Sequence, residues 1–340
     1  MAALDRAAVA AVDTTGQAAD ILDMPAHLRD ALWRVESASI APIDAAGGLV
    51  VAGMGGSSVG ARLAMAALGR RLRRPFAIAD GYALPPWTGP DHLVLCASYS
   101  GATEETLACY DDAAERGAPR LVATTGGPLA ERARRDGAPV IPLPGGFQPR
   151  AAVGYGIVSA LEAATLASAA PSLRAEVDAA AVLAERLAAE WGPDGDEEDE
   201  AKALARRLHG TIPVVVGAEL TAPVAYRWKC QVNENAGLPA FAGELPEADH
   251  NEVVGWPGAA GRGPFSAVFL EDGEAHPRNR ARSELTAEVA AEGATVVERI
   301  ATRGETRLER LVSLYLAVLA GTDPVDIEPI DRVKAALAQR

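Results

Sequence analysis

The sequence predicts an α/β protein made of two doubly wound parallel-sheet domains with flanking helices. Short apolar runs, each the length of a buried strand, alternate with longer amphipathic stretches, a pattern typical of parallel sheets covered by helices. The pattern occurs twice, with its first strands roughly 160 residues apart, which indicates a weak duplication of one unit. The 340 residues suffice for two domains. We expect a helical segment at 1–47, a first domain at 48–190 and a second at 200–340.

Composition narrows the class of protein. The net charge of −14 argues against general binding of nucleic acids or anionic membranes, although one site on an acidic protein can still be positive. The three cysteines are scattered, so neither a disulfide framework nor a cysteine metal site is expected. Aspartates interrupt the first 24 residues where a signal peptide needs an apolar run. No run approaches the roughly 18 apolar residues that span a bilayer. We expect a cytoplasmic protein.

The first round of the pattern follows a stretch at 1–45 that is predicted to be helical. It contains three buried strands, and the first two are each followed by a turn of small and hydroxyl residues and then by a helix. The strands are expected at 49–52, 92–98 and 120–125, the turns at 53–58 and 99–103, and the helices at 59–68 and 104–117.

The second round follows a predicted helix at 151–191. Residues 191–202 are acidic and rich in turn formers, which indicates either an exposed connection or the start of a solvated helix. The strands are then expected at 212–218, 263–272 and 295–300, with helices within 219–236, at 276–293, at 305–320 and around 331–339.

Two of the turns contain residues suited to binding an anion. In the turn at 53–58, Gly56 and Ser57 lie before a helix whose free N–H groups can face a ligand. The turn lacks the lysine of a Walker loop, and taken alone it is explained as a tight connection between strand and helix. In the second turn Ser98, Ser100 and Thr103 follow a buried strand. Capping of the helix accounts for one of these hydroxyls but poorly for three, so this turn predicts a phosphate cradle.

Three further residues are candidates for catalysis. Arg150 follows the first α/β round beside a proline, although an isolated arginine is more often a surface ion-pair partner. Glu234 and His250 lie sixteen residues apart among amides and acids, a combination suited to proton transfer. The alternatives are a carboxylate on a helix face and a structural histidine. Since HExxH and cysteine spacings are lacking, we expect no metal and no cofactor.

Together these motifs resemble one family, the bifunctional phosphoglucose/phosphomannose isomerases of the sugar isomerase (SIS) domain superfamily. The resemblance extends from about residue 48 to 337. The matching strings are GMGGSS at 53–58, SYSGATEETL at 98–107, TTGGPLAE at 124–131, QPRAA at 148–152, VAYRWKCQVNENAGLPAFAGELPEADHNEVVGW at 224–256 and YLAVLAGTDPVDIEPIDRVKAAL at 315–337.

The resemblance implies two SIS domains in a homodimer whose active sites lie near the subunit interface. It implies an intramolecular oxidoreductase of the isomerase class, which converts glucose 6-phosphate into fructose 6-phosphate, with mannose 6-phosphate as a second candidate substrate. Glu234 would move the proton between C1 and C2, and Arg150 would stabilise the enediolate. His250, supplied by either subunit, and Lys334 would assist ring opening and proton transfers at oxygen. The implied phosphate-binding residues are Gly56, Ser57, Ser98, Ser100 and Thr103.

The sequence departs from the family pattern at four positions. Ser58 replaces a usual glycine, Ala102 an asparagine and Gly237 a lysine. Ile327 replaces a threonine and predicts weaker activity on mannose phosphate than on glucose phosphate. Two alternatives stay open: a non-catalytic sensor of sugar phosphates, which would not need the four catalytic candidates together, and an isomerase of another phosphosugar.

Overall fold

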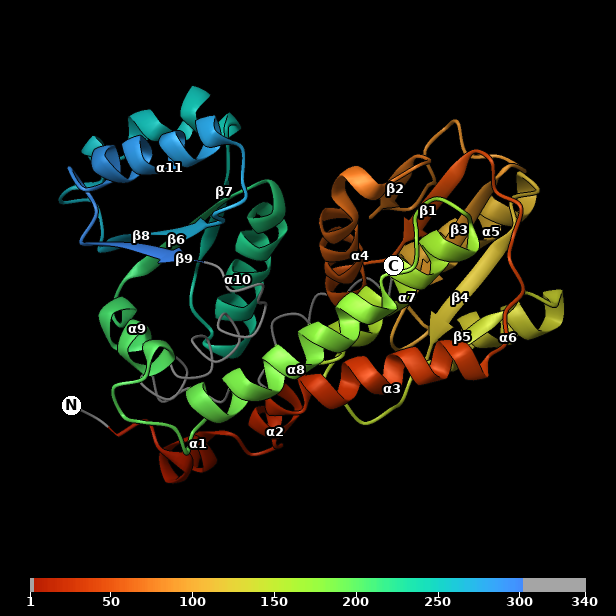
Figure 1. Cartoon of the computed structure of the whole chain (residues 1–340), viewed down its shortest axis with the longest axis horizontal. Helices are drawn as coiled ribbons and strands as arrows, with labels where there is room; N and C mark the ends of the chain where they lie inside the picture. The colour runs from red at the N-terminus through yellow and green to blue at the C-terminus, as the bar shows by residue number, and fades with distance from the viewer. Residues whose placement is uncertain (1–2, 302–340) are drawn as a thin grey trace, which may run out of the picture. The chain divides into compact units, whose positions relative to one another are not determined.

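The computed structural model describes residues 3–301, which form two compact units (Figure 1). One unit is Asp23–Glu185, and the other combines residues 3–22 with residues 186–301. Each unit contains one parallel sheet with helices on both faces, so the predicted fold class is confirmed. The helices predicted at 305–320 and 331–339 lie outside the described part of the chain.

The first unit is built on a five-stranded sheet, as far as the described residues show. Its strands are β1 (Gly48–Ala52), β2 (Phe76–Ala79), β3 (His92–Ala97), β4 (Arg120–Thr124) and β5 (Val140–Pro142). Their order in the sheet is β2-β1-β3-β4-β5, so the chain winds outward in both directions from the neighbours β1 and β3. Every residue of these two strands is buried, as expected for central parallel strands. The point between them is where ligands bind in open α/β sheets.

Helices cover both faces of this sheet. One face packs against α5 and α6, where apolar residues such as Val94, Tyr110 and Leu129 form a buried core. The other face packs against α4 and α7, which approach closely because Gly60 and Gly156 meet at their crossing. The helices of this unit are α3 (Met24–Ser37), α4 (Gly55–Leu68), η1 (Gly69–Arg71), α5 (Glu104–Glu115), α6 (Gly127–Asp136), α7 (Val153–Leu166) and most of α8 (Arg174–Trp191).

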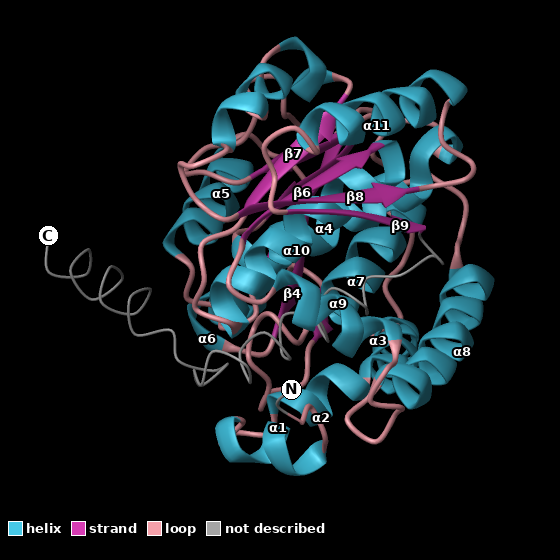
Figure 2. Cartoon of the chain, turned by 90° about the vertical axis from the view of Figure 1, so that its left-hand side faces the viewer, coloured by secondary structure: helices cyan, strands magenta, loops and turns pink. Residues whose placement is uncertain are grey.

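The second unit contains a four-stranded sheet within the described range. Its strands are β6 (Ile212–Ala218), β7 (Phe241–Leu245), β8 (Phe265–Glu271) and β9 (Val296–Ala301), in the order β7-β6-β8-β9. In Figures 1 and 2, α11 covers one face of this sheet and α10 the other. The helices of this unit are α1 (Arg6–Val12), α2 (Gln17–Leu22), α9 (Glu200–Leu208), η2 (Glu219–Thr221), α10 (Ala222–Asn235), η3 (Glu247–His250), η4 (Glu252–Gly255), η5 (Pro257–Ala259) and α11 (Pro277–Ala290).

Several predicted boundaries are wrong. The helical stretch predicted at 1–45 is three helices, and the last of them ends at Ser37. The turn predicted at 53–58 is largely the first turn of α4, which begins at Gly55. The helix predicted at 151–191 is divided into α7 and α8. Three strands, β2, β5 and β7, were not predicted.

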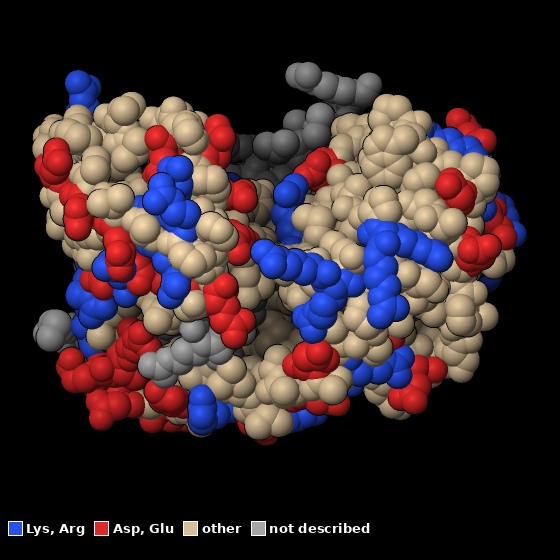
Figure 3. Space-filling model, turned by 45° about the horizontal axis from the view of Figure 1, so that its top comes forward, with Lys and Arg blue, Asp and Glu red and all other residues tan. Residues whose placement is uncertain are grey.

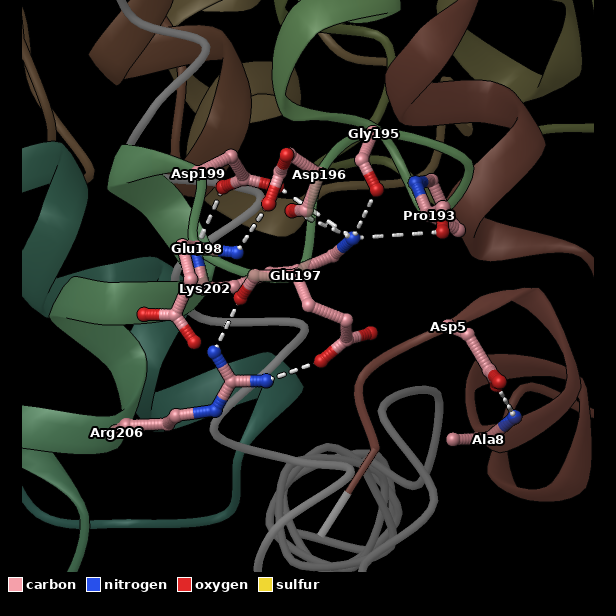
Figure 4. A network of polar contacts seen from close by, with 10 residues as sticks. All are labelled: Asp5, Ala8, Pro193, Gly195, Asp196, Glu197, Glu198, Asp199, Lys202 and Arg206. Carbon is pink, nitrogen blue, oxygen red and sulfur yellow. Dashed lines mark hydrogen bonds and ion pairs between the residues drawn. The ribbon is translucent and has the colours of Figure 1, made fainter. Parts of the chain in front are cut away.

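The acidic connection after α8 is only partly exposed, because a buried lysine holds it together (Figure 4). Lys202 is fully buried, and its Nζ donates to the carbonyl oxygens of Gly195 at 2.9 Å and Asp196 at 3.2 Å. The carboxylate of Asp199 lies 3.5 Å from the same nitrogen. Burial raises the pKa of Asp199, although the lysine opposes the shift. The charges predicted to be solvated therefore include a buried lysine–carboxylate pair, with the lysine bonded to backbone carbonyl groups of the turn.

Candidate active site

The turn between β3 and α5 folds its hydroxyl groups toward one another. Ser98 Oγ lies 2.8 Å from Thr103 Oγ1 and accepts the N–H of Gly101 at 3.1 Å. Ser100 Oγ accepts the N–H of Ala102 at 3.3 Å. Thr103 is the N-cap residue of α5, but its side chain makes no capping hydrogen bond. Conventional capping therefore does not account for this group of hydroxyls.

The glycine-rich segment after β1 lies against the end of β3. A Cβ atom built on Gly53 would be 2.9 Å from the carbonyl oxygen of Ala97 and 3.0 Å from Cβ of Ser57. Such a close approach leaves little room for a side chain at Gly53. The contact places the first turn of α4, with Ser57, at the same edge of the sheet as the Ser98 turn. Two of the predicted phosphate-binding segments are thus brought together.

Arg150 joins this edge from a distant part of the sequence. A Cβ atom on Gly56 would lie 3.0 Å from the carbonyl oxygen of Pro149 and 3.8 Å from Cα of Arg150. Arg150 lies three residues before the start of α7 and is only 3% exposed, so it is buried rather than on the surface. The structure therefore brings the loop of Arg150 to the N-terminal end of α4, which is consistent with a shared anion site.

A third turn, which follows β4, packs against the turn between β3 and α5, which we call the phosphate turn after its predicted role. Gly101 has a φ of +67°, and a Cβ atom there would lie 1.9 Å from the carbonyl oxygen of Gly126. Thr125 donates its N–H and its hydroxyl to the carbonyl oxygen of Tyr99, at 3.1 and 2.8 Å. The string TTGG matches the family, but its sequence alone does not indicate that it supports the neighbouring turn.

Glu234 and His250 lie on different sides of the second sheet. Glu234 is half-buried near the end of α10, just before β7, whereas His250 is exposed after the end of β7. The neighbour of His250, Asp249, accepts hydrogen bonds from Arg282 at 2.8 Å and Thr286 at 2.6 Å, both on α11. Since α10 and α11 cover opposite faces, the sheet stands between the two candidates (Figures 1 and 2).

The packing of the His250 segment agrees with this placement. Ala248 and Trp256, on either side of His250, are buried in the same apolar cluster as Phe269 and Ala287. That cluster fills the space between the sheet and α11. The structure therefore places Glu234 and His250 of one chain on opposite faces of the second sheet.

The remaining candidates are placed as follows. Lys334 and Ile327 lie outside the described residues. Ser58 is buried and Ala102 is exposed. Gly237 has a φ of +62°, a left-handed conformation that favours glycine over the lysine usual in the family.

Charge is distributed rather than gathered on the surface seen in Figure 3, where basic and acidic side chains are interspersed. Within residues 3–301 no group of three or more histidine, cysteine, aspartate or glutamate side chains could hold a metal ion. Across that same part of the chain, no helix combines the length and apolar character needed to cross a membrane.

Comparison with known proteins identifies clear relatives. Residues 197–337 match the family described as the bacterial phospho-glucose isomerase C-terminal SIS domain. The chain is 36% identical over 300 residues to a bifunctional phosphoglucose/phosphomannose isomerase of Aquifex aeolicus, covering 85% of this chain and 90% of that protein. A protein of the same description from Caldicellulosiruptor bescii is 35% identical over 303 residues, covering 86% of this chain and 89% of the other.

Solved structures confirm the fold. The crystal structure of a hypothetical protein from Thermus thermophilus superposes with a TM-score of 0.76 at 19% identity, covering 98% of this chain and 93% of that one. At this identity the similarity concerns the fold alone.

Proposed function

This chain belongs to the bifunctional phosphoglucose/phosphomannose isomerase family, and from that premise we propose that it interconverts glucose 6-phosphate and fructose 6-phosphate, with mannose 6-phosphate as a second aldose. The observation that supports this function best is the meeting of three segments where the first sheet reverses its strand order. These segments are the phosphate turn after β3, the start of α4 and the loop of Arg150.

The phosphate group binds at the carboxyl edge of β1 and β3. Backbone N–H groups at the start of α4 and hydroxyls of the turn act as donors there. The hydroxyls already joined to each other can each still make a further hydrogen bond. These contacts do not read the sugar ring. The group comprises Gly56, Ser57, Ser98, Ser100 and Thr103.

The reaction moves hydrogen within the sugar and requires no net oxidant. Glu234 removes the proton from C2 of the open-chain aldose and returns it to C1, while a proton passes from the oxygen on C2 to the oxygen on C1. Arg150 stabilises the negative charge that develops on the enediolate oxygens. His250 and Lys334 assist ring opening and the proton transfers at oxygen. In this mechanism no step requires a metal.

We propose further that the protein acts as a homodimer in which His250 is supplied by the partner subunit. The support is the separation of Glu234 from His250 by the second sheet. A group that assists ring opening must lie within hydrogen-bond reach of the sugar on which the base acts. A second copy could place its exposed His250 there, whereas the His250 segment of the same chain is bonded to α11 on the opposite face of the sheet.

The activity is tested by incubating the protein with each aldose phosphate and detecting ketose formation. Glu234→Gln keeps the shape of the side chain and removes the base, so turnover should fall at least about 100-fold with little change in KM. Glu288→Gln, the same change on an exposed position of α11, is the control and should remain active. A wild-type protein that binds sugar phosphate without converting it would instead support the sensor.

The shared site is tested by mixing two inactive variants, Glu234→Gln and His250→Ala. In a mixed dimer, one active site receives an intact Glu234 and an intact partner His250. Subunit exchange should therefore restore activity. Failure to recover activity in dimers shown to have exchanged would contradict supply from the partner.

A further inference from the structure

We propose that Tyr99 is a positioning residue that couples the phosphate-binding turn to the loop of Arg150. The inference rests on the proposed function, because it assigns Arg150 to the reaction. Tyr99 lies between Ser98 and Ser100 in the phosphate turn, and it is half-buried. Its main chain and its side chain contact two different segments.

The main chain of Tyr99 is held by the turn after β4. Its carbonyl oxygen accepts both the N–H and the hydroxyl of Thr125, at 3.1 and 2.8 Å. The neighbouring backbone is also fixed, because the carbonyl oxygen of Gly101 accepts the N–H of Leu129 at 2.9 Å. The tyrosine therefore projects from a backbone that two turns stabilise together.

The side chain of Tyr99 reaches the arginine loop. Its hydroxyl oxygen accepts the backbone N–H of Phe147 at 2.9 Å, three residues before Arg150. The ring of Phe147 packs on the other side against His27 of α3, with 4.6 Å between ring centroids, and against Tyr155 of α7 at 6.0 Å. Phe147 is thus held at its amide by the phosphate turn and at its ring by two helices.

The short segment after Phe147 transmits this restraint to Arg150. Its backbone is tightly turned, with the N–H of Ala151 bonded to the carbonyl oxygen of Gln148 at 2.8 Å. The carbonyl oxygen of Pro149 then abuts Gly56 at the start of α4. Arg150 is buried within this arrangement, so a shift of Phe147 must move either the arginine or its contact with α4. Binding of phosphate to the turn is therefore coupled to the position of Arg150.

The variant Tyr99→Phe tests the coupling, because it keeps the aromatic ring and removes only the hydroxyl. Loss of one hydrogen bond of this kind should lower kcat about 5- to 10-fold. The KM for glucose 6-phosphate and inhibition by inorganic phosphate should change little, since the phosphate contacts are retained. Tyr110→Phe is the matched control: it also removes a tyrosine hydroxyl bond, to Asp136 at 3.1 Å, but on α5. It should leave kcat unchanged.

A double-mutant cycle asks whether Tyr99 acts through Arg150. Tyr99→Phe should lower kcat in the wild-type background and have no further effect in Arg150→Ala. An unchanged kcat, a rise in KM alone, or the same fold-loss in both backgrounds would each overturn the inference.

Hydrogen exchange measures the coupling without relying on activity. Inorganic phosphate should slow exchange of backbone amides in residues 144–152 of the wild type, and Tyr99→Phe should abolish most of that protection. Equal protection in the two proteins would overturn the coupling even if the wild type proved inactive. An inactive wild type that shows the predicted exchange difference would contradict the isomerase proposal and leave the coupling supported.

Discussion

Substitution of Gly101 by alanine should open the phosphate turn and lower the free energy of unfolding. Gly101 has a φ of +67°, and an added Cβ would lie 1.9 Å from the carbonyl oxygen of Gly126 and 2.8 Å from the hydroxyl oxygen of Thr124. Because the nearest atom belongs to the backbone, the turn after β4 must move. Gly137 is the matched control, since its φ is +66° and nothing lies within 4 Å of its added Cβ.

The two variants share the cost of a left-handed backbone, about 1–2 kcal/mol for a residue with a side chain. Only Gly101→Ala adds steric strain, for which about 1–3 kcal/mol is typical. Moving the turn also weakens the bond from Leu129 N–H to the carbonyl oxygen of Gly101, worth about 1 kcal/mol. Gly101→Ala should therefore lower the free energy of unfolding by about 2–4 kcal/mol more than Gly137→Ala.

Urea unfolding of the two variants and the wild type measures this difference. Under conditions where Gly101→Ala is still folded, its KM for sugar phosphate should also rise, whereas Gly137→Ala should bind normally. Equal losses of stability in the two variants would refute the reasoning, because the steric contact would then contribute nothing beyond the shared backbone cost.

Three further predictions concern protonation, thiols and metals. Hydrogen bonds from Arg135 and Arg120 lower the pKa of Asp136 to about 2. The ionised carboxylate therefore stabilises the folded state at pH values above the unfolded pKa of about 4, and this contribution is lost as the pH falls toward 2. Asp136→Asn should thus be less stable than the wild type at pH 6 but similar to it at pH 2. The same difference in stability at both pH values would contradict this. Burial raises the pKa of Cys109 to about 11 and also raises the pKa of Cys230. A disulfide reagent at pH 8 should therefore label these thiols far more slowly in the native protein than in the unfolded protein. Rapid labelling of the native protein would contradict this. Exhaustive chelation should leave isomerase activity unchanged, and loss restored by zinc would overturn the metal-free mechanism.

All the strands that the sequence patterns missed lie at sheet edges, although one edge strand, β9, was predicted. The central strands β1, β3, β6 and β8 are continuous apolar runs because helices cover both of their faces. The missed strands β2, β5 and β7 all lie at sheet edges and are only three to five residues long. The strands β2 and β5 are apolar but too short to give a pattern, and β7 is interrupted by Glu244. Their pairing is determined by a neighbour far away in sequence.

Local patterns also misjudged two segments, one because of a contact distant in sequence and one because of contacts within the same turn. Gly55 and Gly56 were assigned to a turn because glycine is a poor helix former. In the structure they begin α4, where Gly56 leaves space for the backbone of Pro149. Lys202 was assigned to a solvated acidic stretch, but it is buried because its ammonium group bonds the carbonyl oxygens of the preceding turn. Neither the contact of Gly56 with Pro149 nor the bonds of Lys202 to the turn can be identified from composition.

The candidate site shows the same limit more sharply. The hydroxyl turn and Arg150 could be singled out as motifs, but their meeting depends on a contact between residues 56 and 149 that no local pattern contains. Glu234 and His250 were singled out as residues suited to proton transfer, with the histidine supplied by either subunit, but the sequence does not show on which face of a sheet each one lies. Here the intervening residues include β7, and the histidine segment is then bound to α11 on the far face. This separation is the reason for proposing that a second subunit supplies the histidine. The contacts between the histidine segment and α11 are therefore the structural argument for the proposed shared active site.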